Sequence, residues 1–282
     1  MKTKSTINVW NNTFIILGII CIFIGIHSCK KEGKVAMIDS DSVMDNDHNV
    51  YKTVKIGKQW WMAENLRTKT YRNGDSINYI GITNQYDSER FDSAQWRLSA
   101  DKGAYCILGT DSASISNNGK NYGFLYNWYV IKDSRNIAPA GWHVPTDADW
   151  KELEIYLGMN KDTVEKVNWR GANEGSKLKR KPDGSIKAVQ AWLFDLNLSE
   201  NNLWGTNESG FSALGGSCKM FNGKEGTPGI LYTGFWWSAS EFGNSEAWYR
   251  YLDYNKTNVF RFYGPKTYGF SIRCVKDATV YE

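Results

Sequence analysis

Residues 234–277 read GFWWSASEFGNSEAWYRYLDYNKTNVFRFYGPKTYGFSIRCVKD, and this stretch decides the fold class. It contains four segments rich in aromatic and β-branched residues, which favour strands: GFWWSASE, AWYRYLDYN, NVFRFYG and YGFSIRCVKD. The segments are separated by residue pairs that favour turns, namely Gly243-Asn244, Asn255-Lys256 and Gly264-Pro265. Because neighbouring strands joined by short turns pair antiparallel, the stretch predicts a meander of strands.

A helix is predicted upstream, where DADWKELEIYLG follows Thr146. Thr146 is expected to cap this helix, and Asp149 stands at the third position, as in a capping box with a shorter acidic side chain. The expected buried stripe is Trp150, Leu153 and Leu157. Near the start of the domain, Gly57-Lys58 lies between two apolar segments and predicts a hairpin. Residues 68–120 are expected to form long loops with short strands. The sequence therefore predicts an α+β domain, with a predominantly antiparallel sheet, a few helices and long loops.

The amino terminus predicts export and lipid attachment. Lys2 and Lys4 precede the apolar run FIILGIICIFIGI, which is shorter than the ~20 residues needed to span a bilayer. The residues before Cys29 resemble a bacterial lipobox, so residues 1–28 are interpreted as a lipoprotein signal peptide and Cys29 as the lipidated residue. An ordinary signal peptide or an uncleaved anchor with an incidental cysteine is the alternative. Residues 29–49 are polar and are expected to form a flexible tether, which leaves residues 50–282 as the globular domain.

Composition and charge exclude several classes of protein. Aromatic residues make up 15% of the chain, which is too many for a disordered protein. The chain has 34 basic and 30 acidic residues, and removal of the signal peptide with Lys2 and Lys4 leaves 32 basic residues against the same 30 acidic ones. This balance lacks the excess of positive charge that a dedicated nucleic-acid binder needs. We therefore expect no nucleic-acid partner.

The cysteines limit the disulfides and metal sites that the domain could hold. Cys106, Cys218 and Cys274 are left after the signal peptide and the lipid site, so an exported domain can form at most one internal disulfide. A bond between Cys106 and Cys274 is favoured, with Cys218 left as a thiol. The chain has no CxxC motif and few histidines, so we expect no structural zinc site.

Six segments in order together resemble the Fibrobacter succinogenes major paralogous domain: VYKTVKIGKQWWMAENL, YGFLYNWYV, APAGWHVPTDADWKELEIYLG, TNESGFSALGG, GFWWSASE and GFSIRCVKD. They extend from about Val50 to Asp277. The resemblance implies a secreted or lipid-anchored protein of Bacteroidetes-type bacteria, and the family has no established activity. It also implies a fold similar to the C-type-lectin-like and formylglycine-generating-enzyme-like folds. Cys218 departs from the family, which more often has an aromatic residue after Gly-Gly.

The candidate ligand-binding residues are Trp61, Trp237, Glu241 and Arg250. Alternation along a strand is expected to turn one ring of each Trp pair outward, which makes Trp61 and Trp237 candidate surface rings for stacking on sugars. Most other tryptophans are expected in the core. Glu241 and Arg250 are interpreted first as members of a buried polar network and second as ligand contacts. The EPN and QPD triplets of calcium-dependent lectins are absent from the sequence, so no metal ligand is predicted. No cofactor and no catalytic residue is predicted either.

These observations predict a lipid-anchored protein of the cell envelope, attached through its lipid to the outer membrane and facing the periplasm or the exterior. Its expected role is a non-catalytic binding module for a glycan or a protein. The alternatives are a structural envelope lipoprotein without a small-molecule site and an enzyme related to the formylglycine-generating enzymes.

Overall fold

The computed structural model of the protein describes residues 40–81, 93–99, 101–109, 111–181, 192, 205–220, 225–226 and 229–278. The predicted signal peptide, the predicted lipid site Cys29 and residues 29–39 of the predicted tether lie outside the described residues. Within the described part of the chain, no helix is long and apolar enough to cross a membrane.

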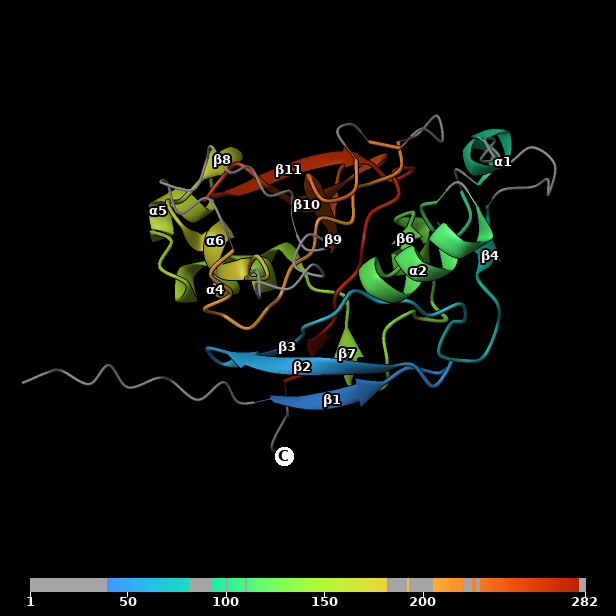
Figure 1. Cartoon of the computed structure of the whole chain (residues 1–282), viewed down its shortest axis with the longest axis horizontal. Helices are drawn as coiled ribbons and strands as arrows, with labels where there is room; N and C mark the ends of the chain where they lie inside the picture. The colour runs from blue at the N-terminus through green and yellow to red at the C-terminus, as the bar shows by residue number, and fades with distance from the viewer. Residues whose placement is uncertain are drawn as a thin grey trace, which may run out of the picture. The chain divides into compact units, whose positions relative to one another are not determined.

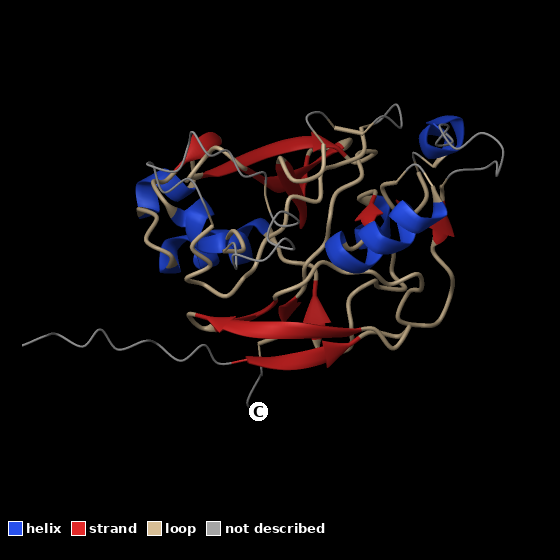
Figure 2. Ribbon diagram, in the orientation of Figure 1, coloured by secondary structure: helices blue, strands red, loops and turns tan. Residues whose placement is uncertain are grey.

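The described strands form three sheets (Figure 1 and Figure 2). The first has the order β1 (Ser40–Met44), β2 (Val50–Ile56), β3 (Gln59–Met62), β12 (Val275–Lys276) and β7 (Trp142–His143). The second has the order β8 (Asn168–Arg170), β11 (Val259–Pro265), β10 (Glu246–Asp253) and β9 (Thr233–Phe242). The third has the order β4 (Asn78–Tyr79), β5 (Ala104–Cys106) and β6 (Leu125–Tyr126). The pairings between these strands are antiparallel, except that β4 and β5 are parallel.

Short helices lie between the strands: α1 (Ser93–Leu98), α2 (Ser112–Tyr122), α3 (Tyr129–Lys132), α4 (Asp147–Tyr156), α5 (Lys161–Val164) and α6 (Glu174–Leu178). The predicted α+β class with mainly antiparallel sheets is confirmed. Helix α4 is the one that the sequence predicts, and its capping box forms as expected: Thr146 Oγ1 accepts from the backbone N–H of Asp149, and the Asp149 carboxylate accepts from that of Thr146. Helix α2 lies in a region predicted as loops. Its sequence SASISNNGKNY has few good helix formers, and an Asp111 capping box holds its start.

The strand predictions are confirmed for the hairpins and wrong for the last strand. Gly57 has a φ of 63° in the two-residue turn between β2 and β3, a conformation that glycine adopts without strain. Strands β9, β10 and β11 pair in sequence, as the meander predicts. The fourth predicted segment does not continue the antiparallel meander, and its backbone pairing with β9 is limited to an isolated parallel bridge. Phe270 and Ser271 make isolated bridges to Tyr126 and Trp236, and only Val275–Lys276 forms a strand, in the first sheet.

The predicted tether ends earlier than residue 49. Residues Ser40–Met44 form the edge strand β1, paired with β2. The carboxylate of buried Asp45 then accepts hydrogen bonds from the backbone N–H groups of Asp47 and Asn49 and holds the turn. An edge strand can expose one polar face, and the turn is built from side-chain hydrogen bonds, so this segment folds without the apolar pattern that the prediction required.

The predicted disulfide between Cys106 and Cys274 is wrong. Cys106, Cys218 and Cys274 are buried free thiols. Cys106 lies in a small apolar cluster with Trp96 and Leu125, whereas Cys274 lies in the largest cluster, as does Cys218. Burial raises the pKa of Cys106 and of Cys218 to about 12 each. All three thiols therefore pack as small apolar side chains.

Candidate functional site

The two predicted surface tryptophans are buried. Trp61 and Trp237 are each 0% exposed. The ring of Trp61 lies 4.9 Å from that of Trp150 on α4, and the ring of Trp237 lies 4.3 Å from that of Phe270. The side chains of β9 alternate as predicted, but both faces of the strand are covered at this position. Trp61 and Trp237 therefore belong to the core, and their assignment as ligand-binding rings is wrong.

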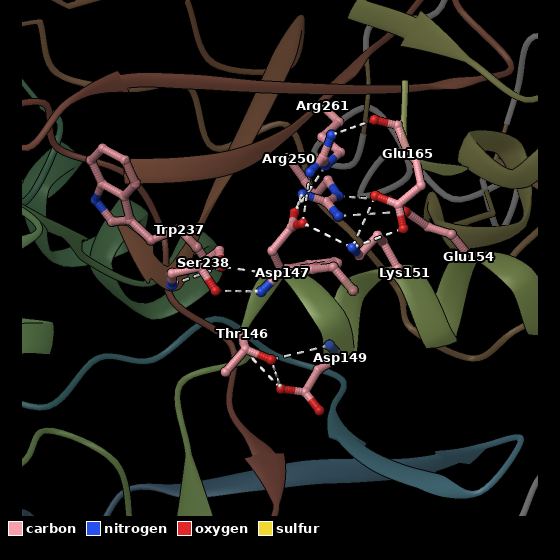
Figure 3. Close-up of polar contacts among 12 residues, drawn as sticks. Thr146, Asp147, Asp149, Lys151, Glu154, Glu165, Trp237, Ser238, Arg250 and Arg261 are labelled. Atoms are coloured by element: carbon pink, nitrogen blue, oxygen red, sulfur yellow. Dashed lines mark hydrogen bonds and ion pairs between the residues drawn. The ribbon is translucent and has the colours of Figure 1, made fainter. Parts of the chain in front are cut away.

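Arg250 is also buried, at 1% exposed, in an ion-pair cluster beneath the second sheet (Figure 3). Its Nε lies 2.7 Å from Glu154 Oε1, and its Nη1 lies 2.8 Å from Asp147 Oδ1. Asp147 also receives Arg261, whose Nη2 lies 2.7 Å from Asp147 Oδ2. Burial by itself would raise the pKa of Asp147, but hydrogen bonds and charges of Arg261 and Arg250 hold it well below its usual range.

The ion-pair cluster fastens α4 to the sheet. Asp147 and Glu154 are seven residues apart, two turns of helix, so both carboxylates project from the same face as Trp150. That spacing in DADWKELE is the signal in the sequence that indicates the cluster. Glu154 also binds Arg170 on β8, with 2.6 Å between Oε2 and Nη2. Arg250 therefore has a structural role, as the first interpretation predicted, and is not available as a ligand contact.

Glu241 lies apart from this cluster. It is in the exposed end of β9, and its Oε2 is 3.2 Å from Lys266 Nζ. Its side chain is 45% exposed, so it could reach a ligand, but the structure does not bring it together with Trp61, Trp237 or Arg250.

The other face of the second sheet carries half-buried rings, which we call the aromatic face. Its members are Trp169, Phe235, Tyr249, Tyr251, Phe260 and Phe262. Cross-strand pairing places them on one side of the sheet, because directly paired residues point to the same face. The pairs are Tyr251 with Phe235, Tyr251 with Phe260, Tyr249 with Phe262, and Phe260 with Trp169.

The rings of the aromatic face touch one another in a continuous series. The ring centroids of Phe235 and Tyr251 are 4.5 Å apart and stacked, and Tyr251 is 5.1 Å from Trp169 on the edge strand β8. At the inner end, Phe235 stacks on Phe270 at 5.0 Å, and Phe270 contacts Trp237. Trp237 thus lies at the buried end of a series whose outer rings are partly exposed. Alternation selected the correct face of β9, but not the residues that reach solvent.

A family model described as the Fibrobacter succinogenes major domain matches residues 54–276. The chain belongs to this family. The matched region of the Fibrobacter succinogenes major domain contains α4, the ion-pair cluster and every ring of the aromatic face. Comparison with characterised protein sequences and comparison with solved structures gave no match.

The aromatic face of this Fibrobacter succinogenes major domain combines apolar ring surfaces with phenolic hydroxyls. Burial raises the pKa of Tyr249 and Tyr251 well above the usual value, so both phenols stay protonated and neutral. The Tyr251 hydroxyl donates to the Asp253 carboxylate at the rim of the face. No group of three or more His, Cys, Asp or Glu side chains within the described ranges could hold a metal ion. The rings of this face offer stacking, and the neutral phenolic hydroxyls of Tyr249 and Tyr251 offer hydrogen bonding.

Proposed function

We propose that the protein is a lipid-anchored, non-catalytic binding module of the cell envelope, and that it binds a glycan or a protein through the aromatic face. The observation that carries the proposal is the series of six half-buried rings on one side of the β8-β11-β10-β9 sheet. Stacked rings that keep part of their surface in water can receive the apolar face of a sugar ring or an apolar side chain, and tyrosine adds a polar tip.

The proposal also includes kinship to the C-type-lectin-like fold. Its support is the helix that begins after Pro145-Thr146, the antiparallel strands that follow it and the long connections between them. A glycan is the favoured ligand, because the aromatic face presents neutral rings and hydroxyls rather than charge. Superposition of an experimental structure of residues 30–282 on C-type lectins tests the kinship. A different order of strands around α4 would reject it.

The binding experiment uses residues 30–282 on a glycan array, with and without calcium. We expect binding that Tyr251→Ala and Trp169→Ala each weaken at least about tenfold, because each removes a ring from the partly exposed end of the series. Tyr156→Ala is the matched control, since it removes an exposed ring on α4 that is 62% exposed and outside the face. Circular dichroism checks that each variant is folded. Binding that survives both face variants would contradict the proposed site.

A structural envelope role is the second candidate, because three of the four predicted ligand contacts are buried in the core or in ion pairs. It predicts that the array stays blank and that deletion of the gene weakens the envelope. An enzyme related to the formylglycine-generating enzymes is disfavoured. Burial raises the pKa of the Cys106 and Cys218 thiols to about 12, so neither supplies a thiolate at neutral pH.

The anchor is tested separately. Cys29→Ala is expected to move the protein from the membrane fraction to the soluble fraction and to abolish labelling by a fatty acid, because the acyl chains attach at this thiol. Cys21→Ala, in the apolar run of the signal peptide, is the matched control and should leave both unchanged. Labelling that persists in Cys29→Ala would place the lipid elsewhere.

A further inference from the structure

An open cleft lies at the end of the first sheet, outside the aromatic face. It has a volume of about 670 Å³ and lies between the β1–β2 turn, the segment after β3 and helix α2. This volume is within the range of small-ligand sites, roughly 300–1,000 Å³. Nothing in the proposed function uses this cleft.

The rim of the cleft carries an excess of positive charge. Arg67, Lys69 and Lys120 line it, and Asp47 is the carboxylate among its lining residues. Arg67 is committed to Glu64, at 3.1 Å, and to the backbone carbonyl of Val50. Lys69 and Lys120 are exposed, and within the described residues neither ammonium group has a hydrogen-bond or ion-pair partner. The cleft is therefore lined by two lysines whose ammonium groups have no ion-pair partner among the described residues.

The Asp47 carboxylate is occupied by donors other than the two lysine ammonium groups. Its carboxylate accepts hydrogen bonds at 2.8 Å from the hydroxyls of Thr68 and Thr70, and it also accepts from the backbone N–H of Lys69. Burial by itself would raise the pKa of Asp47, but these hydrogen bonds lower it below the usual value. The carboxylate thus fixes the β1–β2 turn against the segment after β3, and the wall of the cleft is formed before any ligand arrives.

The floor of the cleft is apolar. Ile107, Ile115 and Phe124 line it, together with Gly119 on α2. A Cβ atom at Gly119 would lie 3.1 Å from Phe124 Cε1 and 3.4 Å from Ile107 Cδ1, so the absence of a side chain allows these residues to approach the helix. Asn46 and Ser116 add neutral hydrogen-bonding groups to the walls. Asn49 also lines the cleft, but its side-chain amide donates to Asp45 Oδ2 and to the backbone carbonyl of Arg67.

We propose that this cleft binds an anionic saccharide, whose acidic group is held by Lys69 and Lys120 while an apolar ring face lies on Ile107, Ile115 and Phe124. The lysines supply charge-assisted hydrogen bonds to a carboxylate or sulfate. Asn46 and Ser116 match the hydroxyl groups that a sugar presents. A second described cleft, of about 410 Å³, has a more even balance of charge: Asp101 and Asp133 line it beside Lys102, Lys132 and Arg135, and Arg135 is paired with both Asp75 and Asp133.

Calorimetric titration of residues 30–282 tests the proposal with three probes: trigalacturonate, a heparin-derived disaccharide and fully methyl-esterified trigalacturonate. We expect saturable binding of at least one acidic probe, and affinity at least about tenfold weaker for the uncharged ester. Binding of trigalacturonate would show that a carboxylate suffices, whereas binding of only the heparin-derived disaccharide, which carries both groups, would show that sulfate is required. The double variant Lys69→Gln/Lys120→Gln should lose at least about tenfold in affinity for the acidic probe. Added salt should weaken binding, because the contacts are between exposed charges.

The matched control is Lys55→Gln/Lys58→Gln, which removes the same charge at the far end of β2 from the cleft. Equal loss in this control would overturn the proposal, as would equal affinity for the ester or no binding of either acidic probe by the intact protein. Binding to phosphatidylglycerol vesicles in place of the saccharides, lost in the Lys69 and Lys120 variant, would assign the cleft to a membrane surface and reject a saccharide. Tyr251→Ala should leave affinity for the acidic probe unchanged, so failure of this site and failure of the aromatic face can be told apart.

Discussion

Trp236 and Trp237 are adjacent in β9, and both are buried because each is covered from a different side of the strand. The indole N–H of Trp236 donates to Asn65 Oδ1 at 2.9 Å, and that of Trp237 donates to the backbone carbonyl of Tyr126 at 2.9 Å. The two rings belong to separate apolar clusters. Strand β9 is thus buried between two parts of the apolar core. For this reason its Trp pair does not form a binding surface.

The buried ion-pair cluster predicts a large loss of stability when one carboxylate is neutralised. Glu154→Gln leaves Arg170 and Arg250 without their shared counter-charge inside the protein. We expect the free energy of unfolding to fall by about 3–5 kcal/mol, measured by urea denaturation. Glu165→Gln is the control, because Glu165 is 63% exposed in its pair with Lys151 and should cost less than about 1 kcal/mol. Equal losses of unfolding free energy in the two variants would contradict the prediction that the buried cluster contributes more to stability than the exposed ion pair.

The contacts of His143 with two carboxylates are expected to make the stability of the protein depend on pH. Its Nδ1 lies 2.6 Å from Asp277 Oδ1, and its Nε2 lies 3.4 Å from Asp149 Oδ2. The hydrogen bond with Asp149, assisted by that with Asp277, raises the pKa of His143 above 6.5 although burial opposes the shift. The folded protein therefore holds the imidazolium proton more tightly than the unfolded chain does. This stabilisation is complete at pH values below the pKa of His143 in the unfolded chain, and it is lost as the pH rises through the pKa of His143 in the folded protein.

The measurement is Tm between about pH 5 and pH 9 for the protein and for His143→Gln. We expect the difference in Tm between them to be largest on the acidic side and to shrink as the pH rises. A difference that stays constant, or that grows with pH, would show that the protonated imidazole does not bridge the two carboxylates.

Because the three thiols are buried, we expect them to be unreactive and unpaired in the folded domain. Cys106, Cys218 and Cys274 should stay unmodified by a thiol reagent in the native protein and should all react after denaturation, because the folded domain excludes the reagent. The mass of the exported domain should not change on reduction. A peptide that joins Cys106 to Cys274 in a non-reducing digest would restore the disulfide that the sequence predicted.

Lys179 forms a second buried polar site, and we expect its removal to lower the stability of the protein. It is 0% exposed, and its Nζ donates to the backbone carbonyls of Asp253, Tyr254 and Lys256 at 2.8 to 3.4 Å. Lys179→Met keeps most of the volume but removes this donor, and we expect it to lower the free energy of unfolding by about 1–3 kcal/mol. Lys256→Met, at an exposed side chain of the same turn, should change stability little. A neutral result for Lys179→Met would mean that water replaces the ammonium group.

The sequence predicted the parts of the fold that local rules govern. The capping box of Thr146 and Asp149, the glycine turn at Gly57 and the pairing of β9, β10 and β11 follow from spacing and residue type, and they are present as predicted. Family membership could also be read from the order of the sequence blocks. Helix α2 and strand β1 were missed, because caps and hydrogen-bonded turns hold them in place of an apolar stripe.

The sequence by itself determined the fold class, the family and the face of β9 that carries rings. Which ring on that face reaches solvent was decided only by the tertiary structure, because Trp237 is covered by Phe270 while Tyr251 on the next strand is not fully covered. The surroundings of each cysteine and the ion-pair partners of Arg250 were decided in the same way. Alternation along a strand fixes the direction of a side chain, but burial depends on what segments distant in the sequence place over it.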